Sequence, residues 1–533
     1  MDPMEYIVPN RKRLPYGMMN FAVIRREDYY YVDKTDFIRQ VVEEGSLITL
    51  LPRPRRFGKS LLLSTFEAYF QGKRELFHGL AIEELEEEWT VRPVLHLSLN
   101  AEKYDSVDVL RNLLETQLGV WEELYGSKAR ANPSLSVRFM SVIRRACEVS
   151  GQRVAVLIDE YDKPLLRNFH DTKLQDEFRE LLTAFYTVLK DADPYLQFVL
   201  ITGVTKFAQM GIFSTLNQLQ DISYTLDYNT LCGLTHNEIT ASFGLEINAM
   251  AEKQKDTPAG VMERMTRKYD GYRFTGDEEF TPMFNPFSVL NAFQQRTFGN
   301  FWFSSGTPTF LVDMLRQTDF DLREMDNLEV LESSLTDDRA NIDNPIPMVY
   351  QSGYLTIKAY DPEFQLYTLG FPNEEVKYGF LNFAAPFYTP LSENESGFFI
   401  GKFVQELRTG DIDAFLTRLR AFFAGIPYQL NAKEERHYQT IFYIVFSLLG
   451  QYTRAEVASV RGRADAVVKT ADIIYVFEFK LDGTVEEALR QIDDRGYLIP
   501  YTADGRRLVK VAVSFDQETR NLGEWCVERE EIK

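Results

Sequence analysis

The sequence predicts an α/β protein with a parallel sheet in its first half and a second, smaller α/β domain at its C-terminal end. Three apolar runs in the first half lead into polar residues, over 47–60, 154–160 and 196–206. Continuous apolar runs of this kind are typical of strands that are buried on both faces of a parallel sheet. A chain of 533 residues is too long for one core, and we expect about two to four domains.

The first apolar run leads into a loop that is suited to binding phosphate. The predicted strand at 47–51 ends at two prolines, and Gly58-Lys59-Ser60 opens an apolar helix that runs to residue 70. Backbone N–H groups and the helix N-terminus favour an anion, Lys59 reaches the outer phosphates, and the Ser60 hydroxyl ligates Mg²⁺. The candidate ATP-binding residues of this loop are Arg56, Phe57, Gly58, Lys59, Ser60 and Leu61.

One position of the loop departs from the usual phosphate-binding pattern, which begins with glycine. Arg53 stands at that position, whereas Gly58, Lys59 and Ser60 are intact at the end that contacts the phosphates. The alternative interpretation is a basic loop that precedes a core helix and binds no nucleotide.

A second strand ends in two acids that suit ATP hydrolysis. The apolar run at 154–158 is followed directly by Asp159 and Glu160. The carboxyl ends of parallel strands face the ligand crevice, so Asp159 would hold Mg²⁺ and Glu160 would orient and deprotonate the attacking water. A buried strand that merely happens to end in two acids is the alternative.

A third strand supplies a polar residue of the kind that senses a γ-phosphate. The run at 196–201 ends in Thr202, and Thr205 and Lys206 follow. We expect the apolar run at 94–99 to be the strand inserted between the Lys59 and Asp159 signatures. The three motifs follow one another in the order expected of a nucleotide-binding sheet, and each lies at the end of a predicted strand. Together they favour such a sheet.

The charge of the chain is acidic and unevenly distributed. Of the net charge of −20, residues 61–430 carry −20, residues 1–60 carry +3 and residues 431–533 carry −3. An acidic surface repels nucleic acid and membranes non-specifically, but the two nearly neutral ends leave room for a local basic groove.

Composition and the chain start predict a cytoplasmic protein. Residues 1–13 lack the apolar core of a signal peptide, and no run approaches the length of a membrane span. Cys147, Cys232 and Cys526 are far apart and odd in number, which indicates reduced thiols. The five histidines show no paired metal spacing, so a structural zinc site is not expected.

Several separated motifs of the first half resemble the AAA-ATPase-like family. They are Tyr31-Val32-Asp33-Lys34-Thr35, the loop from Arg53 to Ser60, the run Leu157-Ile158-Asp159-Glu160-Tyr161-Asp162-Lys163-Pro164, and the segments at 202–207 and 213–217. The resemblance covers most of residues 5–300 and implies a P-loop NTPase-type fold, with ATP and Mg²⁺ as cofactors. The missing first glycine is typical of the family.

The middle of the chain predicts a helical lid and a winged-helix-like segment. Helices are expected near 262–269 and from Asn285 onward, where Pro286 occupies the first turn. Residues 345–370 predict a helix followed by a hairpin, which a winged-helix module would explain. We therefore place the P-loop domain at 1–235, the lid at 236–335, the winged-helix-like segment at 336–394 and a last domain at 395–533.

The last domain predicts a helix, three strands, a helix and a final strand at 508–515. Asp465 lies on one predicted strand, at 464–468, and Glu478 and Lys480 lie two residues apart on one face of the next. If these strands are adjacent, Asp465 meets Glu478, two carboxylates can hold Mg²⁺, and Lys480 can orient or activate water for phosphodiester hydrolysis. The alternative is a charged but merely solvated strand face.

This last segment resembles the PD-(D/E)xK nuclease superfamily, over roughly residues 395–530. The similarity lies in Gly462-Arg463-Ala464-Asp465, in Val476-Phe477-Glu478-Phe479-Lys480 and in Ala488-Leu489-Arg490-Gln491-Ile492 with Tyr497. It implies a restriction-endonuclease-like α/β fold with a catalytic trio of Asp465, Glu478 and Lys480, and with Gln491 as an auxiliary residue. Glu435 is a further candidate metal contact, although a solvated helix position explains it as well.

Two functional hypotheses follow from these sites. In the first, the nucleotide state gates cleavage of nucleic acid, with DNA expected before RNA, at the C-terminal domain. In the second, ATP binding switches a signalling or assembly protein whose nuclease-like domain binds without cutting. The sequence leaves a homo-oligomer open and offers no membrane partner.

Overall fold

The computed structural model describes most of the chain between residues 11 and 530. Outside the description lie residues 1–10, 101, 127–132, 169–170, 207–211, 214–215, 306–310, 312–314, 316–319, 337–343, 390–392, 426–434, 458–464, 481–482, 517–518, 520 and 531–533. Some side chains beside these gaps, Glu435 among them, lie outside it too. The chain divides into two compact units, Met1–Trp302 with Leu328–Asn373 and Phe303–Asn327 with Glu374–Lys533. The four-part division stays a prediction.

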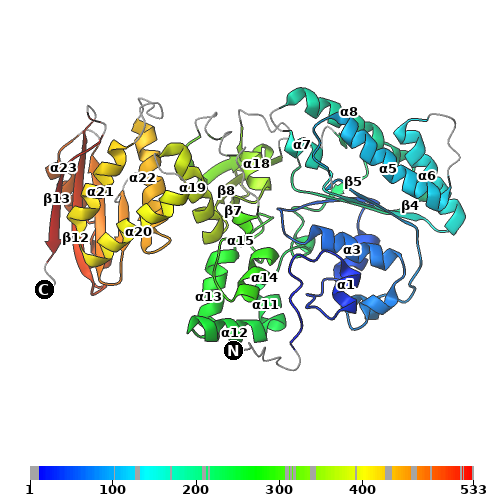
Figure 1. Ribbon diagram of the computed structural model, residues 1–533, viewed down its shortest axis with the longest axis horizontal. Helices are drawn as coiled ribbons and strands as arrows, with labels where there is room; N and C mark the ends of the chain where they lie inside the picture. The colour runs from blue at the N-terminus through cyan, green and yellow to red at the C-terminus, as the bar shows by residue number, and fades with distance from the viewer. Residues whose placement is uncertain are drawn as a thin grey trace, which may run out of the picture. The chain divides into compact units, whose positions relative to one another are not determined.

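The first unit is built on a five-stranded, wholly parallel sheet in the order β2-β3-β4-β1-β5. Its strands are β1 (Ile48–Pro52), β2 (Val94–Ser98), β3 (Val154–Asp159), β4 (Leu196–Gly203) and β5 (Leu219–Asp221). Helices α1 (Phe21–Arg26) and α3 (Lys59–Phe70) lie on one side of the sheet, and α5 (Val107–Tyr125), α6 (Leu135–Ser150) and α8 (Thr172–Tyr186) lie on the other (Figure 1). The central strands are buried on both faces, which explains their continuous apolar runs.

The order of the strands corrects one expectation. The strand inserted between the Lys59 and Asp159 signatures in space is β4, whereas β2 lies at the edge of the sheet. Sequence order alone could not give this, because parallel strands joined by helical crossovers need not be neighbours. As a result, the carboxyl ends of β1, β3 and β4 meet side by side, and they position the first site.

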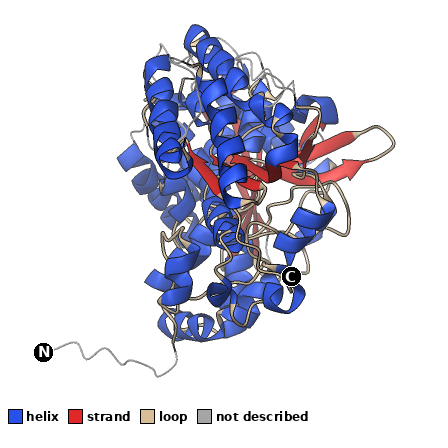
Figure 2. Cartoon of the chain, turned by 90° about the vertical axis from the view of Figure 1, so that its right-hand side faces the viewer, coloured by secondary structure: helices blue, strands red, loops and turns tan. Residues whose placement is uncertain are grey.

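Shorter helices complete this sheet region. They are α2 (Asp36–Glu44), α4 (Ala81–Leu85), α7 (Lys163–Arg167) and α9 (Val188–Asp191). Figure 2 colours the helices blue and the strands red.

Four helices follow the sheet and share one apolar core. They are α11 (His236–Ser242), α12 (Gly244–Gln254), α13 (Pro258–Tyr269) and α14 (Pro286–Gln295). Phe243, Met250, Met265 and Val289 are among the buried residues of that core. Asn285 caps α14 through its side chain, with Pro286 in the first turn as predicted. The short helix α15 (Phe301–Ser304) comes next.

The predicted helix and hairpin at 345–370 are confirmed. They are α18 (Ile346–Gln351), β7 (Thr356–Asp361) and β8 (Leu366–Gly370). The strand β6 (Leu328–Leu331), followed by α17 (Glu332–Thr336), extends the hairpin into an antiparallel sheet in the order β6-β8-β7.

The second unit holds a mixed sheet in the order β13-β12-β11-β10-β9. Its strands are β9 (Arg454–Val457), β10 (Ala466–Lys469), β11 (Ile473–Lys480), β12 (Arg507–Asp516) and β13 (Asn521–Glu530), and its helices are α19 (Glu374–Tyr388), α20 (Glu393–Thr409), α21 (Ile412–Ala424), α22 (Glu435–Leu449) and α23 (Val485–Asp494). Phe477 of β11 packs against Phe415 of α21 and Phe446 of α22, whereas Val476 faces Ile492 of α23. Helices therefore cover both faces of the sheet at β11, and its side chains alternate between them.

The expectation that the strand at 508–515 is the last one is wrong, because β13 follows it. This strand pairs antiparallel with β12 along most of its length and forms one edge of the sheet. Its sequence has only a short apolar run, Trp525-Cys526-Val527, which Glu524 precedes and the charged residues 528–530 follow. Charges on an edge strand hinder pairing with other chains, and they hide the strand from a search for apolar runs.

Candidate active sites

The loop between β1 and α3 has the shape of a phosphate cradle. Gly58 adopts the left-handed region at φ 91° directly before α3 begins at Lys59, and an added Cβ there would meet nothing within 4 Å. The buried Lys59 ammonium donates to the carbonyl oxygens of Arg53 and Pro54, at 2.9 and 3.0 Å. Burial lowers the pKa of Lys59, with Glu160 and Asp159 opposing this effect. A polyphosphate would offer the ammonium stronger acceptors than two carbonyl groups.

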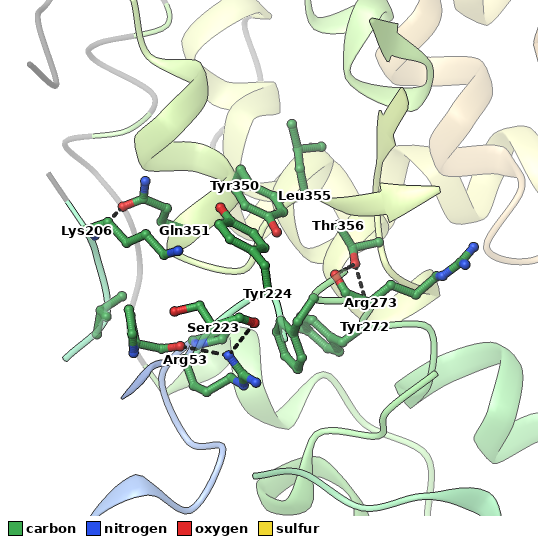
Figure 3. A pocket seen from close by; sticks show the side chains of 14 residues that line it. Arg53, Lys206, Ser223, Tyr224, Tyr272, Arg273, Tyr350, Gln351, Leu355 and Thr356 are labelled. Carbon is green, nitrogen blue, oxygen red and sulfur yellow. Dashed lines mark hydrogen bonds between the residues drawn. The ribbon is translucent and has the colours of Figure 1, made fainter. Parts of the chain in front are cut away.

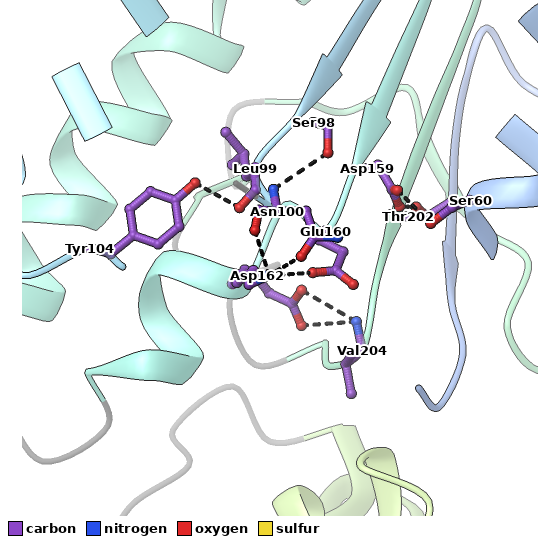
Figure 4. A network of polar contacts seen from close by, with 11 residues as sticks. Ser60, Ser98, Leu99, Asn100, Tyr104, Asp159, Glu160, Asp162, Thr202 and Val204 are labelled. Carbon is purple, nitrogen blue, oxygen red and sulfur yellow. Dashed lines mark hydrogen bonds and ion pairs between the residues drawn. The ribbon is translucent and has the colours of Figure 1, made fainter. Parts of the chain in front are cut away.

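Asp159 joins the ends of β3 and β4 to the start of α3 in one hydrogen-bond cluster (Figure 4). The Ser60 hydroxyl donates to Oδ2 of Asp159 at 2.7 Å, and the Thr202 hydroxyl donates to Oδ1 at 2.8 Å. These are the residues that the sequence predicts around Mg²⁺ and the γ-phosphate. The structure brings them together because β4 lies between β1 and β3.

Glu160 projects from a strained turn directly after β3. Its backbone has φ 53°, a left-handed conformation that is uncommon for a residue other than glycine. Its carboxylate pairs with the Lys163 ammonium at 3.2 Å, and Lys163 also donates to the backbone carbonyl of Asn100 at 2.8 Å and to the Asn100 side chain. The predicted general base thus lies beside the cluster and is held by a lysine one turn further along the chain (Figure 4).

The residues after Thr202 do not face the cradle. Thr205 donates through both its backbone N–H and its hydroxyl to the buried carboxylate of Asp162, at 2.6 and 2.7 Å. Lys206 forms a 2.5 Å ion pair with Asp221 and lies over the ring of Tyr224. Burial lowers the pKa of Lys206 to about 8. Thr205 and Lys206 therefore anchor the end of β4, and Thr202 alone reaches Asp159.

Arg53 replaces the usual first glycine by becoming part of the core (Figure 3). Its side chain is fully buried, and its guanidinium donates to the carbonyl oxygens of Pro52, Ser223 and Tyr228. The guanidinium also stacks over the ring of Phe274 at 4.3 Å. A glycine-rich loop gains its shape from backbone freedom, whereas this loop is fixed by a buried arginine.

The other predicted loop residues play different parts. Phe57 is buried and packs edge-on against Tyr272, with ring centroids 4.8 Å apart, so its side chain supports the loop. Arg56 is exposed, has φ 68° and lies over the ring of Phe287 at 4.8 Å. Gly58 and Leu61 line a cavity of about 110 Å³ next to the loop.

That cavity has mainly apolar walls and begins at the phosphate loop. Besides Gly58 and Leu61, its lining residues include Leu62, Leu234, Phe243, Leu290, Tyr30, Tyr31, Lys34 and Cys232. A flat, apolar group attached to a phosphate in the loop would fit such a place.

The second unit brings the predicted nuclease residues together. The pairing of Ala466 with Phe477 places Asp465 next to Glu478, and Oδ2 of Asp465 accepts from the backbone N–H of Phe479 at 2.7 Å. Gln491 of α23 donates to Oε1 of Glu478 and accepts from the Lys480 ammonium. All four side chains therefore meet where β11 ends. The predicted turn at 462–464 lies outside the described residues.

Burial raises the pKa of both carboxylates, and the charge of Asp465 adds to the shift of Glu478. Burial, and after it the charge of Asp465, raises the pKa of Glu478 to about 7, whereas Lys480 acts in the opposite direction. Burial also raises the pKa of Asp465. Such a pair holds its negative charge poorly unless a cation is present.

The residues present fit a divalent cation at this place. Oε2 of Glu478 is buried and accepts no hydrogen bond within the described structure. An orphaned carboxylate oxygen beside a second carboxylate offers the oxygen ligands that Mg²⁺ prefers. In the described parts of the chain no group of three or more His, Cys, Asp or Glu side chains could hold a metal, so these two acids would bind it together with water. The predicted third contact, Glu435, has its side chain outside the description.

Comparisons with known proteins match both regions of the chain. The model of a family described as "Predicted AAA-ATPase" matches residues 15–213, and that of the PD-(D/E)XK nuclease superfamily matches residues 433–525. A protein of Azotobacter chroococcum mcd 1, described as "Uncharacterized protein in vnfD 5'region", is 34% identical over 530 residues. The match covers 97% of this chain and 99% of the relative. The chain belongs to the AAA-ATPase-like family. This AAA-ATPase-like protein carries the nuclease-superfamily domain at its C-terminal end, as both resemblances implied.

Two solved structures share low similarity with this AAA-ATPase-like protein. The Orc1 protein of Aeropyrum pernix, in complex with DNA, is 10% identical with a TM-score of 0.23, over 67% of this chain and 95% of that one. Cdc6p of Pyrobaculum aerophilum is 10% identical with a TM-score of 0.21, over 64% and 89%. Both scores are low, so the architecture rests on the sheets described above. No helix in the described ranges is long and apolar enough to cross a membrane.

Sequence reasoning missed the residues that support the sites of this AAA-ATPase-like protein. Lys163 follows Glu160 by three residues, a spacing at which side chains meet on a helix, and this was an available signal. For the run at 31–35, which contains Lys34, contact with a nucleotide base and capping of the next helix explain the sequence equally well. Asn100 gave no signal, because its contact with Lys163 depends on how two loops meet.

The pKa of Glu478 predicts a pH-dependent cost of folding without metal. The folded-state pKa of about 7 lies above the ordinary value of 4.5, so the folded protein retains a proton that the unfolded chain releases. This free-energy cost of folding is absent below pH 4.5 and grows as the pH rises to about 7. Glu478→Gln should therefore gain stability relative to the native protein at pH 8 but not at pH 4.5, measured by urea unfolding in EDTA.

The exposed Glu524→Gln serves as the matched control, since it should show no such pH-dependent gain. An equal effect of Glu478→Gln at both pH values would show that Glu478 titrates normally.

Proposed function

We propose that this protein binds ATP in its first unit, cleaves nucleic acid with the help of Mg²⁺ in its second, and uses the nucleotide state to control cleavage. One observation carries the proposal. A single chain contains two assembled sites, the Ser60–Asp159–Thr202 cluster beside Lys59 and the Asp465–Glu478 pair beside Lys480.

ATP would place its phosphates in the loop and its base in the adjoining cavity. Lys59 would exchange the carbonyl oxygens of Arg53 and Pro54 for phosphate oxygens, and the N-terminal turn of α3 would supply backbone N–H groups. The apolar walls around Leu61 suit the face of a heteroaromatic base.

Hydrolysis would use groups that already lie at the strand ends. Ser60 and Asp159 would hold Mg²⁺, which supplies charge stabilisation to the phosphates when bound. Glu160 would orient water, and Thr202 would contact the γ-phosphate from the end of β4. Glu160 must first leave its ion pair with Lys163, since a carboxylate that is neutralised by an ammonium is a weaker base.

Cleavage would take place at the end of β11. Asp465 and Glu478 would hold Mg²⁺, whose charge lowers the barrier for attack on a phosphodiester. Lys480 would orient the attacking water or stabilise the charge that develops on phosphate, and Gln491 would hold Lys480 and Glu478 in place. The substrate class, with DNA expected before RNA, is part of this proposal.

Nucleotide binding should depend on Lys59. Lys59→Ala removes the only buried ammonium that faces the described loop carbonyls, and we expect ATP affinity to fall at least about tenfold. The measurement is the shift of melting temperature over an ATP titration, because a ligand that binds only the folded state stabilises it.

Lys190 is exposed, so Lys190→Ala is the control for the loss of a charge as such. This variant should show the same ATP-dependent shift of melting temperature as the native protein. If ATP with Mg²⁺ never shifts the melting temperature of the native protein, the loop binds no nucleotide.

Cleavage should depend on the paired acids. With plasmid DNA, an RNA duplex and single-stranded probes, Asp465→Asn, Glu478→Gln and Lys480→Met should each lower the cleavage rate on the order of 100-fold or more. EDTA should abolish the activity, and Mg²⁺ should restore it.

Glu524→Gln, on the same domain but exposed, should cut at the native rate. Cleavage that survives both Asp465→Asn and Glu478→Gln would place the activity elsewhere. Substrate binding without any cleavage would favour a domain that binds but does not cut.

A further inference from the structure

We propose that Lys34 is a specificity-determining residue that donates a hydrogen bond to a ring acceptor of a purine base in the cavity beside Gly58. The proposal rests on the ATP-binding function above and adds the group that reads the base. No other part of the proposed mechanism uses Lys34.

The place of Lys34 in the cavity is the first argument. The cavity of about 110 Å³ is lined by Gly58 of the phosphate loop and mainly by apolar side chains, such as Leu61, Leu234 and Phe243. Lys34 is a lining residue in these surroundings, and its side chain is only 10% exposed. A charged group is expensive to place in an apolar cavity, so its presence there needs a reason.

The hydrogen bonds of the ammonium group are the second argument. Lys34 donates to the carbonyl oxygen of Thr230 and to Oε1 of Glu238, both at 2.6 Å. A lysine ammonium has three N–H donors and no acceptor, so these two bonds fix its direction and leave one donor. A base acceptor in the cavity would complete the set.

Because the Lys34 ammonium is a hydrogen-bond donor, it can contact only an edge of the base that carries an acceptor. An ammonium can meet a ring nitrogen or a carbonyl oxygen of a base, but it repels an exocyclic amino group. Purines present ring acceptors at N1, N3 and N7, and their two rings fill an apolar cavity better than one ring does. The Thr65 hydroxyl, which also lines the cavity, already donates to the carbonyl of Leu61 at 2.9 Å.

The ion pair between Lys34 and Glu238 also links the cavity to α11, the first helix of the proposed lid. Glu238 is the third residue of α11, where its other carboxylate oxygen accepts from the backbone N–H of Thr235 in a capping box. Lys34, which lines the cavity, therefore joins the segment before α2 to α11, the first helix of the proposed lid. A base that contacts Lys34 would be positioned against both.

The test removes the base acceptors one at a time. Affinities of the native protein are measured for ATP, for 1-deaza-, 3-deaza- and 7-deaza-ATP, and for inorganic tripolyphosphate, which has no base. We expect one deaza analogue to bind about tenfold more weakly than ATP, the value of one lost charged hydrogen bond. This arm needs no variant and does not depend on whether a variant folds.

Lys34→Met then identifies the donor. It should bind ATP and the affected deaza analogue equally, while its affinity for tripolyphosphate stays at the native value. Lys12→Met, which removes an exposed lysine paired with Asp28, should keep the native pattern. A merely structural Lys34 would instead lower ATP and tripolyphosphate affinities in the same proportion, and that result overturns the proposal.

Two further outcomes count against it. If all three deaza analogues bind the native protein as ATP does, no ring nitrogen is read and the inference is wrong. If the native protein binds neither ATP nor tripolyphosphate, the proposed function fails and this inference with it. If the native protein binds tripolyphosphate but binds ATP and its deaza analogues equally, the phosphate loop still binds phosphate and only the role of Lys34 is rejected.

Discussion

The first site depends on one carboxylate that accepts hydrogen bonds from both neighbouring elements. Asp159 at the end of β3 binds the Ser60 hydroxyl at the start of α3 and the Thr202 hydroxyl at the end of β4. These contacts require β1, β3 and β4 to be neighbours in the parallel sheet, and they are, with β4 between β1 and β3. The strand order is therefore the constraint from which the geometry of the cradle follows.

The phosphate loop obtains its shape by a less common route. A buried guanidinium that donates to three carbonyl groups and stacks on Phe274 fixes the point where the chain leaves β1. Phe57 and Tyr272 support the other end of the loop. Phe274 and Tyr272 belong to the segment after α13, so the loop and the region of the lid share one packing arrangement. Burying a charge in this way is costly, and the carbonyl contacts offset that cost.

Much of both sites could be predicted because chemistry-bearing residues stood at the ends of strongly apolar strands. The apolar runs located β1, β3, β4 and β11, and period-two alternation placed Glu478 and Lys480 on one face. The order of the strands and the direction of some side chains were harder to predict. No local pattern places β4 between β1 and β3, or shows that Lys206 turns toward Asp221.

Other features were missed for a physical reason that they share. The edge strand β13 carries charges that interrupt its apolar run, and Lys34 and Asn100 act through tertiary contacts between segments that are far apart in sequence. Each of these residues has an ordinary local environment in the sequence. Their roles appear only when loops and helices meet, which local patterns do not specify.

The central claim is that one site controls the other, and a cleavage assay with defined nucleotides tests it most directly. Initial cleavage rates would be compared without nucleotide, with ADP and with a non-hydrolysable ATP analogue, in the native protein and in Lys59→Ala. The account predicts that the native rate changes with the nucleotide, whereas the rate of Lys59→Ala stays constant. A native protein that binds ATP and cuts nucleic acid, but cuts at one rate whatever nucleotide is present, would contradict it.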